Sequence, residues 1–376
     1  VSLNYSGTVQ TPTTRRMVMV TGRTHPALAE NIATELGISL SSIQIREFAN
    51  GEIHCRFDES IRGSDLFIVQ THASPVNDSI MEQLIMIDAG KRASAKRITA
   101  VTPFYWYARQ DRKAEGREPI TARLVADLIT VAGADRVVTV DLHTGQIQGF
   151  FDKPVDHLTA VPLLAEYAAK LFGAGADVTV VSPDAGGGKL MRRFSNYLAE
   201  YDIESELAFI DKRRPKGTHN VAVASEVVGE VEGRHCIVVD DMIDTAGTVA
   251  AAAALLKERG AASVRILATH GLLSGPAVER LSTAPVEEVV VTNTIPLNGK
   301  EQACPKLRVL SERSKLAMPE TAIGFFPDTG VCWHLARLPD EIGTWLALTG
   351  AAIGRADAAL YEAKDAGRNR TIGAES

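Results

Sequence analysis

The chain has 376 residues, of which 45% are hydrophobic and 23% are charged, and its formal net charge is −6. A chain of this length is expected to form two or three domains, and the composition is typical of a globular protein. The slightly acidic balance argues against nucleic acid as a partner. The apolar runs are too short to cross a bilayer, so no membrane partner is expected.

The four cysteines, Cys55, Cys236, Cys304 and Cys332, lie far apart and form no CxxC pair. This spacing predicts neither a zinc site nor a disulfide framework, so we expect reduced thiols and a cytoplasmic location. Residues 1–15 lack the apolar centre of a signal peptide, and we interpret them as a polar leader.

Strand-like and helix-like patterns alternate along the chain, which predicts an α/β fold with parallel sheets flanked by helices. In the first half, strands are expected near 17–21, 66–71, 98–103 and 136–141, and helices near 27–36, 79–93 and 121–132. In the second half, strands are expected near 177–182, 236–240, 264–269 and 288–292, and helices near 161–171, 190–201, 249–259 and 275–281. The two layouts are similar, so we expect two open sheets that face one cleft, with a boundary near residue 160.

The segment FYWYARQDRK, residues 104–113, follows an expected strand and combines aromatic with basic side chains. Parallel sheets bind ligands where their strands end. Aromatic rings can stack on a base, and Arg109 and Arg112 can hold phosphate oxygens through paired hydrogen bonds. These properties suit a nucleotide. Alternatively, the segment is a packed aromatic edge with a solvated basic face.

Two further strands end in polar residues that could bind a metal. VVTVDLH places Asp141 and His143 at a strand end, where the carboxylate could orient the His143 ring. Asp184 follows a strand of the second half and precedes AGGGK; alternatively, it caps a helix or a turn. This segment is not a nucleotide-binding P-loop, because Pro183 and Leu190 occupy the positions of its glycine and its Ser/Thr.

The basic segment DKRRPK, residues 211–216, also follows an expected strand. Such charge runs are usually solvated loops. A cationic loop near a phosphate site would also serve phosphoryl transfer, because it can close and neutralise charge that develops in the transition state.

The segment CIVVDDMIDTAGT, residues 236–248, has the most specific pattern in the chain. A buried strand delivers Asp240 and Asp241 to its end, and the next turn offers threonine hydroxyls and the amides of a helix that starts near Thr248. Gly247 would let the backbone approach a phosphate, while the two acids would accept hydrogen bonds from ribose hydroxyls, directly or through a metal. The pattern predicts a sugar-phosphate site; a strand and loop with solvated acids is the alternative.

The chain contains, in family order, FANGE, TPFYWYARQDRK, VDLHTGQIQGFFD, SPDAGGGK, DKRR and VVDDMIDTAGT. With these motifs, residues 16–311 resemble the bacterial ribose-phosphate pyrophosphokinases, also called phosphoribosyl-pyrophosphate (PRPP) synthases. The resemblance implies two phosphoribosyltransferase-like, doubly wound domains, at 16–160 and 161–311. It also implies that a homo-oligomer, a hexamer in this family, uses Mg²⁺ to transfer the diphosphoryl group of ATP to the 1-hydroxyl of ribose 5-phosphate, giving PRPP and AMP.

The resemblance also assigns roles to individual residues. Matching positions imply that ATP is bound by Phe48, Asn50, Gly51, Glu52, Arg109 and Gln110. They imply that ribose 5-phosphate is bound by Arg214, Asp240, Asp241, Asp244, Thr245, Ala246, Gly247 and Thr248. Magnesium would be bound by His143 and Asp184, and the transition state would be stabilised by Lys212 and Arg214. The family usually has Asp in place of Asn50, which we expect to alter one hydrogen bond to the nucleotide.

Residues 312–376 do not continue the family pattern. Residues 315–354 resemble a fragment of a 3-hydroxyisobutyryl-CoA hydrolase, and residues 355–371 resemble the closing helix of a diguanylate cyclase domain. Both segments are too short to supply the activities of those proteins. We therefore expect catalysis to depend on the part of the chain that precedes them.

Two other functions share part of this pattern. A phosphoribosyltransferase has the ribose-phosphate loop but consumes PRPP, and the FANGE, ARQDRK and DKRR segments disfavour it. A non-catalytic regulatory subunit of the PRPP synthase type is disfavoured because Lys212, Arg214, His143 and Asp184 are all present. Turnover with ATP and ribose 5-phosphate distinguishes the three functions.

Overall fold

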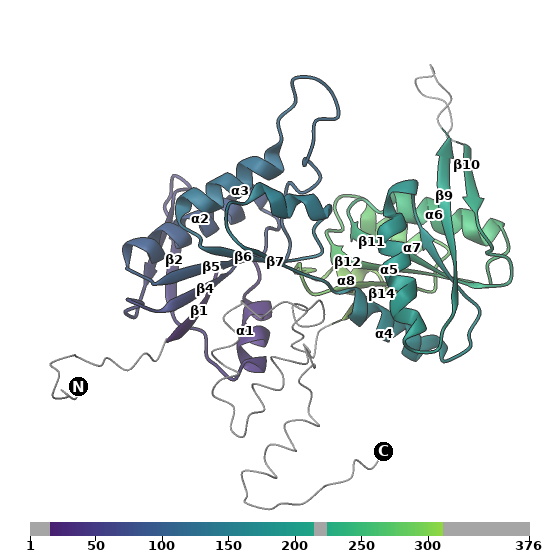
Figure 1. Cartoon of the computed structure of the whole chain (residues 1–376), viewed down its shortest axis with the longest axis horizontal. Coiled ribbons are helices and arrows are strands. Elements are labelled where there is room, and N and C mark those ends of the chain that lie inside the picture. The colour runs from purple at the N-terminus through teal and green to yellow at the C-terminus, as the bar shows by residue number, and fades with distance from the viewer. Residues whose placement is uncertain (1–15, 214–223, 311–376) are drawn as a thin grey trace, which may run out of the picture. The chain divides into compact units, whose positions relative to one another are not determined.

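The computed structural model describes residues 16–213 and 224–310, which form two large β-sheets and one β-hairpin (Figure 1). The first sheet has five strands, and each neighbouring pair is parallel. In spatial order the strands are β1 (Met17–Thr21), β4 (Asp65–Val69), β5 (Arg97–Val101), β6 (Arg136–Val140) and β7 (Val155–Leu158). Because all five run in the same direction, their carboxyl ends lie at one edge of the sheet.

Helices cover both faces of the first sheet. They are α1 (Pro26–Glu35), α2 (Val76–Arg92) and α3 (Thr121–Ala132). Successive strand residues point to opposite faces, so Val18 and Val20 join the core beneath α2 and α3, whereas Met19 packs with Ala29 of α1. Helix α3 ends at Gly133, whose φ of 126° is a conformation that favours glycine.

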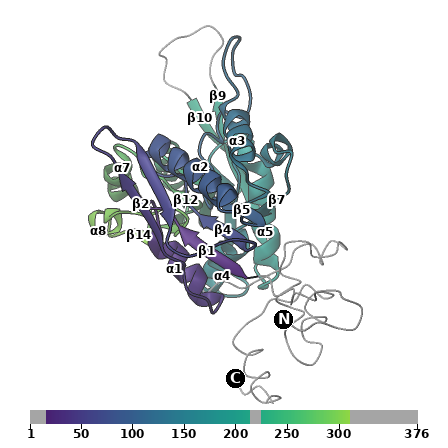
Figure 2. The same ribbon diagram turned by 90° about the vertical axis from the view of Figure 1, so that its left-hand side faces the viewer.

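The segment between α1 and β4 forms an antiparallel hairpin, which the sequence patterns above do not predict. Its strands are β2 (Ile43–Glu47) and β3 (Ile53–Phe57). Phe48 and Glu52 close the turn, since the Phe48 N–H donates to the Glu52 carbonyl at 2.8 Å. Strand β3 lies against α2 (Figure 2). The FANGE motif therefore occupies the turn of a hairpin that is supported by a long helix.

The second sheet has seven strands. In spatial order they are β10 (Ala224–Val228), β9 (Ser205–Arg213), β8 (Val178–Ser182), β11 (His235–Ile243), β12 (Ser263–Gly271), β13 (Glu288–Thr292) and β14 (Leu307–Leu310). Only β10 is antiparallel to its neighbour. The chain order reverses between β8 and β11, which makes this the topological switch point where open α/β sheets bind ligands.

Helices also cover both faces of the second sheet. The helices around this sheet are α4 (Val161–Phe172), α5 (Gly188–Ala199), α6 (Gly247–Glu258), α7 (Ala277–Thr283), α8 (Lys300–Ala303) and the short 3-10 helix η2 (Ala185–Gly187). A second 3-10 helix, η1 (Gly145–Phe150), lies between β6 and β7 of the first sheet and contacts α3. Ile237 and Val239 of β11 face the core formed with α4 and α5, and Cys236 and Val238 face the core formed with α6 and α7. All four side chains are at most 3% exposed, so β11 is a central strand that is buried on both faces.

Residues of the two sheets share a buried polar junction. His270 of β12 lies within hydrogen-bond distance of the Thr294 hydroxyl and of the Val140 carbonyl at the end of β6. Its ring also packs on Phe104, with the ring centroids 4.7 Å apart. Thr71 donates to the Thr294 carbonyl at 2.8 Å. These bonds place the carboxyl ends of β6 and β11 in one region of the molecule.

Both sheets confirm the predicted α/β fold class, because they are mainly parallel and are flanked by helices. Each strand and helix expected along residues 17–292 is present. In the described ranges, 16–213 and 224–310, no helix combines the length and the hydropathy needed to span a membrane.

Candidate active site

Strand β11 ends in two adjacent carboxyl groups at the switch point. The Asp240 carboxyl accepts a hydrogen bond from the Asp241 N–H at 2.9 Å. Burial, followed by the neighbouring charge of Asp241, raises the pKa of Asp240 to about 8. The ligand-free protein therefore holds one of its two predicted ribose-binding acids in the protonated form at neutral pH. Strong shifts of this kind are typical of functional sites.

His143 pairs with Asp241 across the two halves of the chain. The ring Nδ1 of His143, which follows β6, lies 2.8 Å from the Asp241 Oδ2. This hydrogen bond raises the pKa of His143. Burial opposes ionisation of Asp241, but the bond to His143 and the positive charge of the ring outweigh it, so the pKa of Asp241 is lowered. The pair is thus an ionised carboxylate beside a histidine that favours the protonated state.

The predicted partnership between Asp141 and His143 is wrong. Asp141 is 5% exposed, and its carboxylate accepts hydrogen bonds from Thr159, from the Ala160 N–H, from Arg193 and from Thr269. These four donors occupy both carboxylate oxygens. The backbone φ of Asp141 is also +36°, which turns the chain after β6 and separates the two side chains. Asp241 orients the ring of His143 instead.

Asp184 lies beside the switch point, in the segment that follows β8. Its Oδ1 accepts hydrogen bonds from the N–H groups of Gly186 and Gly187 at 2.8 and 3.2 Å, which confirms that it caps the short helix η2. Its negative charge also contributes to the raised pKa of Asp240. Asp184 and Asp240 therefore act on the same region of the site.

These donors fit a magnesium ion that retains water and phosphate ligands. The Nδ1 of His143 bonds to Asp241, which leaves Nε2 as the ring atom that can face a ligand. A cation would relieve the repulsion that keeps Asp240 protonated. No group of three His, Cys, Asp or Glu side chains in residues 16–213 and 224–310 is arranged to hold a metal. Mg²⁺ usually binds through one or two carboxylates together with water and substrate phosphates, so a sparse set suits it.

The turn between β11 and α6 has a conformation suited to an anion. Ala246 adopts a left-handed φ of 59° and cannot cap α6 through its side chain. Helix α6 begins at Gly247, one residue before the start expected from the sequence, and presents its N-terminal dipole to the turn. Thr245 and Thr248 flank this position. Free helix N-terminal amides and hydroxyls together form the kind of site that binds phosphate.

Arg109 connects the predicted nucleotide side to this turn. Its Nη1 donates to the Asp244 Oδ2 at 2.8 Å, although the two residues are 135 positions apart. Gln110 accepts a hydrogen bond from the Thr121 hydroxyl at 2.6 Å, at the start of α3. Within residues 16–213 and 224–310, the structure thus brings Arg109, but not Gln110, into hydrogen-bond contact with the predicted ribose 5-phosphate residues.

The aromatic segment before Arg109 is mostly part of the core. Phe104 and Tyr105 are 4% and 2% exposed, and the Tyr105 hydroxyl donates to the Ala122 carbonyl. Phe104 packs on Trp106 with the ring centroids 5.3 Å apart. Phe104 and Tyr105 therefore cannot stack on a base, and for them the alternative of a packed aromatic edge is correct.

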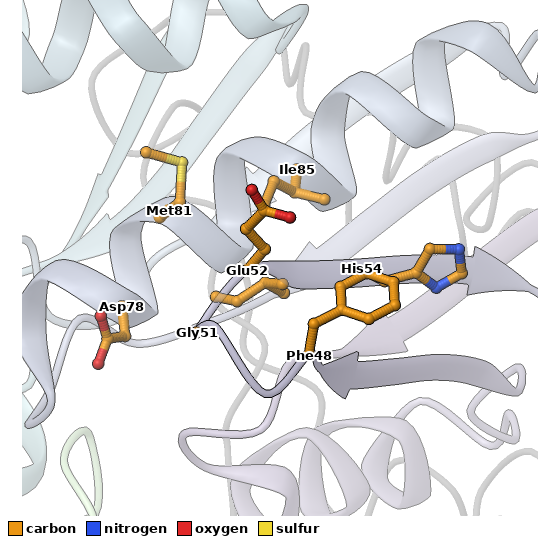
Figure 3. A pocket seen from close by; sticks show the side chains of 8 residues that line it. Phe48, Gly51, Glu52, His54, Asp78, Met81 and Ile85 are labelled. Atoms are coloured by element: carbon orange, nitrogen blue, oxygen red, sulfur yellow. The ribbon is translucent and has the colours of Figure 1, made fainter.

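A pocket of about 460 Å³ lies between the FANGE turn and α2 (Figure 3). It is lined by Phe48, Gly51, Glu52, Ile53, His54, Asp78, Met81 and Ile85. The Phe48 ring is 45% exposed and meets the His54 ring edge-on, with the centroids 6.0 Å apart. The His54 Nδ1 is buried and has no hydrogen-bond partner in the part of the chain that the structure describes. An exposed ring beside an unused polar atom is an arrangement that can receive a base.

The predicted ATP residues fall into two groups. Phe48, Gly51 and Glu52 line this pocket, and the Asn50 side chain accepts a hydrogen bond from the Glu52 N–H at 3.2 Å, which stabilises the turn. Among the described residues, no hydrogen bond or ring contact joins the pocket to Arg109. The pocket residues of α2 carry no signal in the sequence, because their spacing is that of an ordinary amphipathic helix.

The predicted cationic loop, residues 211–216, lies only partly within the described residues. Lys212 belongs to β9, where its backbone pairs with Ser225 of β10, but its side chain is not described. Arg214 falls outside the described ranges. Their roles in stabilising a transition state therefore remain predictions.

Comparisons with known proteins identify the family. Residues 17–133 match the N-terminal domain of ribose phosphate pyrophosphokinase, and residues 204–318 match the phosphoribosyl synthetase-associated domain. The ribose-phosphate pyrophosphokinase of Mycobacterium leprae is 54% identical over 309 residues, which are 82% of this chain and 93% of the relative. This chain belongs to the ribose-phosphate pyrophosphokinase family. The pyrophosphokinase of Streptomyces avermitilis is 53% identical over 306 residues, or 81% of this chain and 91% of the relative.

A solved structure agrees with this pyrophosphokinase in fold. The crystal structure of phosphoribosylpyrophosphate synthetase from Mycobacterium smegmatis has a TM-score of 0.73 and 52% identity, and the match covers 79% of this chain and 95% of that chain. The pyrophosphokinase is therefore a kinase-type transferase with two phosphoribosyltransferase-like α/β domains.

The end of the chain matches a different family. Residues 302–366 match the enoyl-CoA hydratase/isomerase family, which supports the predicted likeness of residues 315–354 to a hydrolase of acyl-CoA. The likeness of residues 355–371 to a diguanylate cyclase helix stays a prediction. Both segments lie outside the described residues.

Proposed function

We propose that this pyrophosphokinase transfers the diphosphoryl group of ATP to ribose 5-phosphate through the residues at the switch point of the second sheet. The oxygen of the 1-hydroxyl attacks the β-phosphorus and loses its proton, and the bond from this phosphorus to the α-phosphate oxygen breaks. The products are PRPP and AMP. This reaction needs both substrates to be held in line, so most of its catalysis is positioning and charge stabilisation.

One observation supports this proposal above the others. Two residues of the ATP side, Arg109 and His143, each bond at 2.8 Å to an acid of the ribose 5-phosphate side, Asp244 and Asp241. A triphosphate held near Arg109 and His143 would therefore lie beside a sugar held by the β11 acids. This juxtaposition is what in-line transfer between the two substrates requires.

The turn from Asp244 to Thr248 would bind the 5-phosphate of the sugar. The N-terminal amides of α6 and the hydroxyls of Thr245 and Thr248 supply hydrogen-bond donors, and the helix dipole favours the negative charge. Asp240 and Asp241 would accept hydrogen bonds from the ribose hydroxyls. Their carboxylates thereby orient the anomeric carbon toward the nucleotide side.

Magnesium would be held at His143 and Asp184, with Asp240 and Asp241 nearby. When bound, Mg²⁺ neutralises phosphate charge and orients the triphosphate. Asp241 holds the His143 ring in one orientation through Nδ1. Ionisation of Asp240, whose pKa is about 8 in the ligand-free protein, would accompany binding of the cation or of the sugar hydroxyls.

Lys212 and Arg214 would stabilise the negative charge that develops during transfer. Lys212 is placed near the end of β9, beside β8 in the second sheet. Cations that act on developing phosphoryl charge contribute to turnover more than to ground-state binding. Arg214 is also proposed to contact ribose 5-phosphate.

We also propose a cytoplasmic homo-oligomer, a hexamer as the resemblance implies. Its support is an exposed apolar stripe on α3, where Leu124 and Val131 are 54% and 76% exposed. Such a stripe is typical of a surface that contacts another protein. Light scattering at several concentrations tests this assembly. The proposed domain division, at residues 160 and 311, is testable by limited proteolysis.

The experiment that tests the function is turnover with ATP and ribose 5-phosphate in the presence of Mg²⁺. PRPP and AMP should form in equal amounts, and Asp241→Asn should abolish both. Asp202→Asn, the same chemical change at an exposed turn after α5, is the matched control and should retain activity. A phosphoribosyltransferase would instead consume PRPP with a base, and a regulatory subunit would produce neither product.

A further inference from the structure

We propose that Arg280 of α7 is a positioning residue for ribose 5-phosphate, because it fixes the turn that binds the phosphate of the sugar. This inference rests on the proposed function, since it concerns the same turn. The guanidinium acts on the backbone of the turn and not on the reacting atoms. Nothing in the sequence pattern marks Arg280, which lies 32 positions beyond Thr248 in a separate helix.

Three consecutive carbonyl groups of the turn each accept a hydrogen bond. The Asp244 carbonyl accepts from the Ser274 N–H at 2.9 Å, and the Ala246 carbonyl accepts from the Ala250 N–H at 3.0 Å. Between them, the Thr245 carbonyl accepts from the Arg280 Nη1 at 3.0 Å. The two outer carbonyls thus bond to backbone N–H groups, whereas the middle carbonyl bonds to the side chain of Arg280.

This hydrogen bond sets the direction of an amide group. In a planar trans peptide, the carbonyl and the N–H point in opposite directions. Because the Thr245 carbonyl points at Arg280, the N–H of Ala246 points away from α7. The left-handed Ala246 then reverses the chain into the first amides of α6. Losing the Arg280 bond would free this peptide to rotate and would misdirect donors that the phosphate needs.

The charge of Arg280 also favours a phosphate. The guanidinium is exposed, and no salt bridge from Arg280 occurs within residues 16–213 and 224–310. Its positive charge at the N-terminal end of α6 is therefore not neutralised by a nearby carboxylate. A sugar phosphate dianion would be attracted by this charge in addition to the helix dipole.

The space around Gly247 also shows that Arg280 lies close to the turn. A Cβ at this position would lie 3.2 Å from the Arg280 Nη1 and 3.9 Å from the Thr245 Oγ1. Gly247 does not have a positive φ, so its backbone conformation is open to other residues. A side chain at this position would therefore press against the Arg280 guanidinium. The sequence-based reason, approach of the phosphate itself, is the alternative that the experiment below separates.

The first experiment measures Michaelis constants for both substrates with the full chain. Arg280→Ala should raise the KM for ribose 5-phosphate about tenfold, the effect of losing one charge-assisted hydrogen bond. The KM for ATP and kcat should stay within about twofold, because the lost contact acts on sugar binding alone. Arg280→Lys keeps the charge but not the planar fork, so it should recover part of the affinity. Arg259→Ala, at the other end of α6, is the matched control for loss of an exposed arginine.

The second experiment is a double-mutant cycle. Gly247→Ala alone should raise the KM for ribose 5-phosphate, because its Cβ displaces the guanidinium. In the Arg280→Ala background the same change should have little further effect, which gives a non-additive cycle. An additive cycle would instead show that Gly247 serves the ligand directly and would overturn the role of Arg280.

The outcomes separate this inference from the proposed function. Wild-type protein that makes no PRPP and AMP contradicts the proposed function itself. Active wild type with an unchanged KM for ribose 5-phosphate in Arg280→Ala overturns only the inference. If Arg280→Ala lowers kcat and the melting temperature and raises both KM values together, its role is structural, and the inference is again overturned.

Discussion

Replacing Asp240 with asparagine should stabilise the ligand-free protein above neutral pH while it abolishes activity. Burial and the charge of Asp241 raise the pKa of Asp240 from 3.8 to about 8. The folded state binds this proton more tightly than the unfolded state, so stability falls as the pH rises from 3.8 to about 8 and is level above that range. At 1.36 kcal/mol per pKa unit, the whole shift corresponds to about 6 kcal/mol.

The expected gain is smaller than this value, because the neighbouring acid offsets part of it. The pKa of Asp241 is lowered, mainly through His143, and this shift stabilises the folded state at neutral pH. We therefore expect Asp240→Asn to add about 2 kcal/mol at pH 8.5. The asparagine oxygen can still accept the Asp241 N–H bond, so the variant should keep its local structure. More stability with less function is the usual relation at an active site.

Thermal unfolding in metal-free buffer measures this effect. A gain of about 2 kcal/mol should raise the melting temperature of a chain this long by roughly 2 to 3 °C at pH 8.5. The gain should shrink at pH 5, where the penalty on the wild type is smaller. Asp202→Asn, at an exposed position, should melt like the wild type at both pH values. If Asp240→Asn melts no higher than the wild type at pH 8.5, the strained carboxyl pair described above does not exist.

Three further predictions follow from the same structure. Lys212→Ala should lower kcat about a hundredfold with little change in either KM, as expected for loss of one transition-state stabiliser; near-normal turnover in steady-state assays would contradict this role. Thr248→Val should raise the KM for ribose 5-phosphate about tenfold and spare ATP, because the Arg109–Asp244 bond remains; calorimetric titration showing equal loss for both ligands would indicate a folding defect. Burial lowers the pKa of His72 to about 4, so its contribution to stability is complete above pH 6.5 and is lost as the pH falls toward 4, by about 3 kcal/mol in all. His72→Gln should reduce this acid sensitivity in urea unfolding, and an unchanged pH profile would refute it.

The sequence predicts the four central strands of the second sheet, β8, β11, β12 and β13, because local patterns determine them, whereas β10 and β14 at its edges are not expected. Residues 236–239 form a continuous apolar run before two acids, which predicts a central strand buried on both faces. The turn and the helix after it carry their own signals in the threonines and in the alanine-rich segment. The start of α6 and the closeness of Gly247 to Arg280 required coordinates, since these two residues are 33 positions apart.

The hairpin β2–β3 was missed although its pattern is visible in the sequence. Ile43 and Ile45 alternate with polar residues, as do Ile53, Cys55 and Phe57, which is the period of a half-buried strand. These strands are short, and the hydrophobic side of the hairpin packs against α2 rather than extending a sheet. The FANGE segment that forms its turn enters the sequence analysis only as a motif of the family resemblance.

Contacts between the two halves could not be predicted from sequence. His143 and Asp241 are 98 positions apart, and their bond depends on how the two sheets pack. A local rule suggested Asp141 as the partner, because it precedes His143 by two residues. The positive φ of Asp141 and its four hydrogen bonds at the junction override that rule.

The central claim, diphosphoryl transfer from ATP to the 1-hydroxyl of ribose 5-phosphate, is tested most directly by the path of one oxygen atom. Ribose 5-phosphate labelled with ¹⁸O at the 1-hydroxyl is incubated with ATP, Mg²⁺ and the full chain, and the products are followed by ³¹P NMR. The account predicts AMP as the nucleotide product and PRPP with the label in the bridge between the anomeric carbon and the β-phosphorus. Formation of ADP with a ribose bisphosphate, or loss of the label from PRPP, would contradict it.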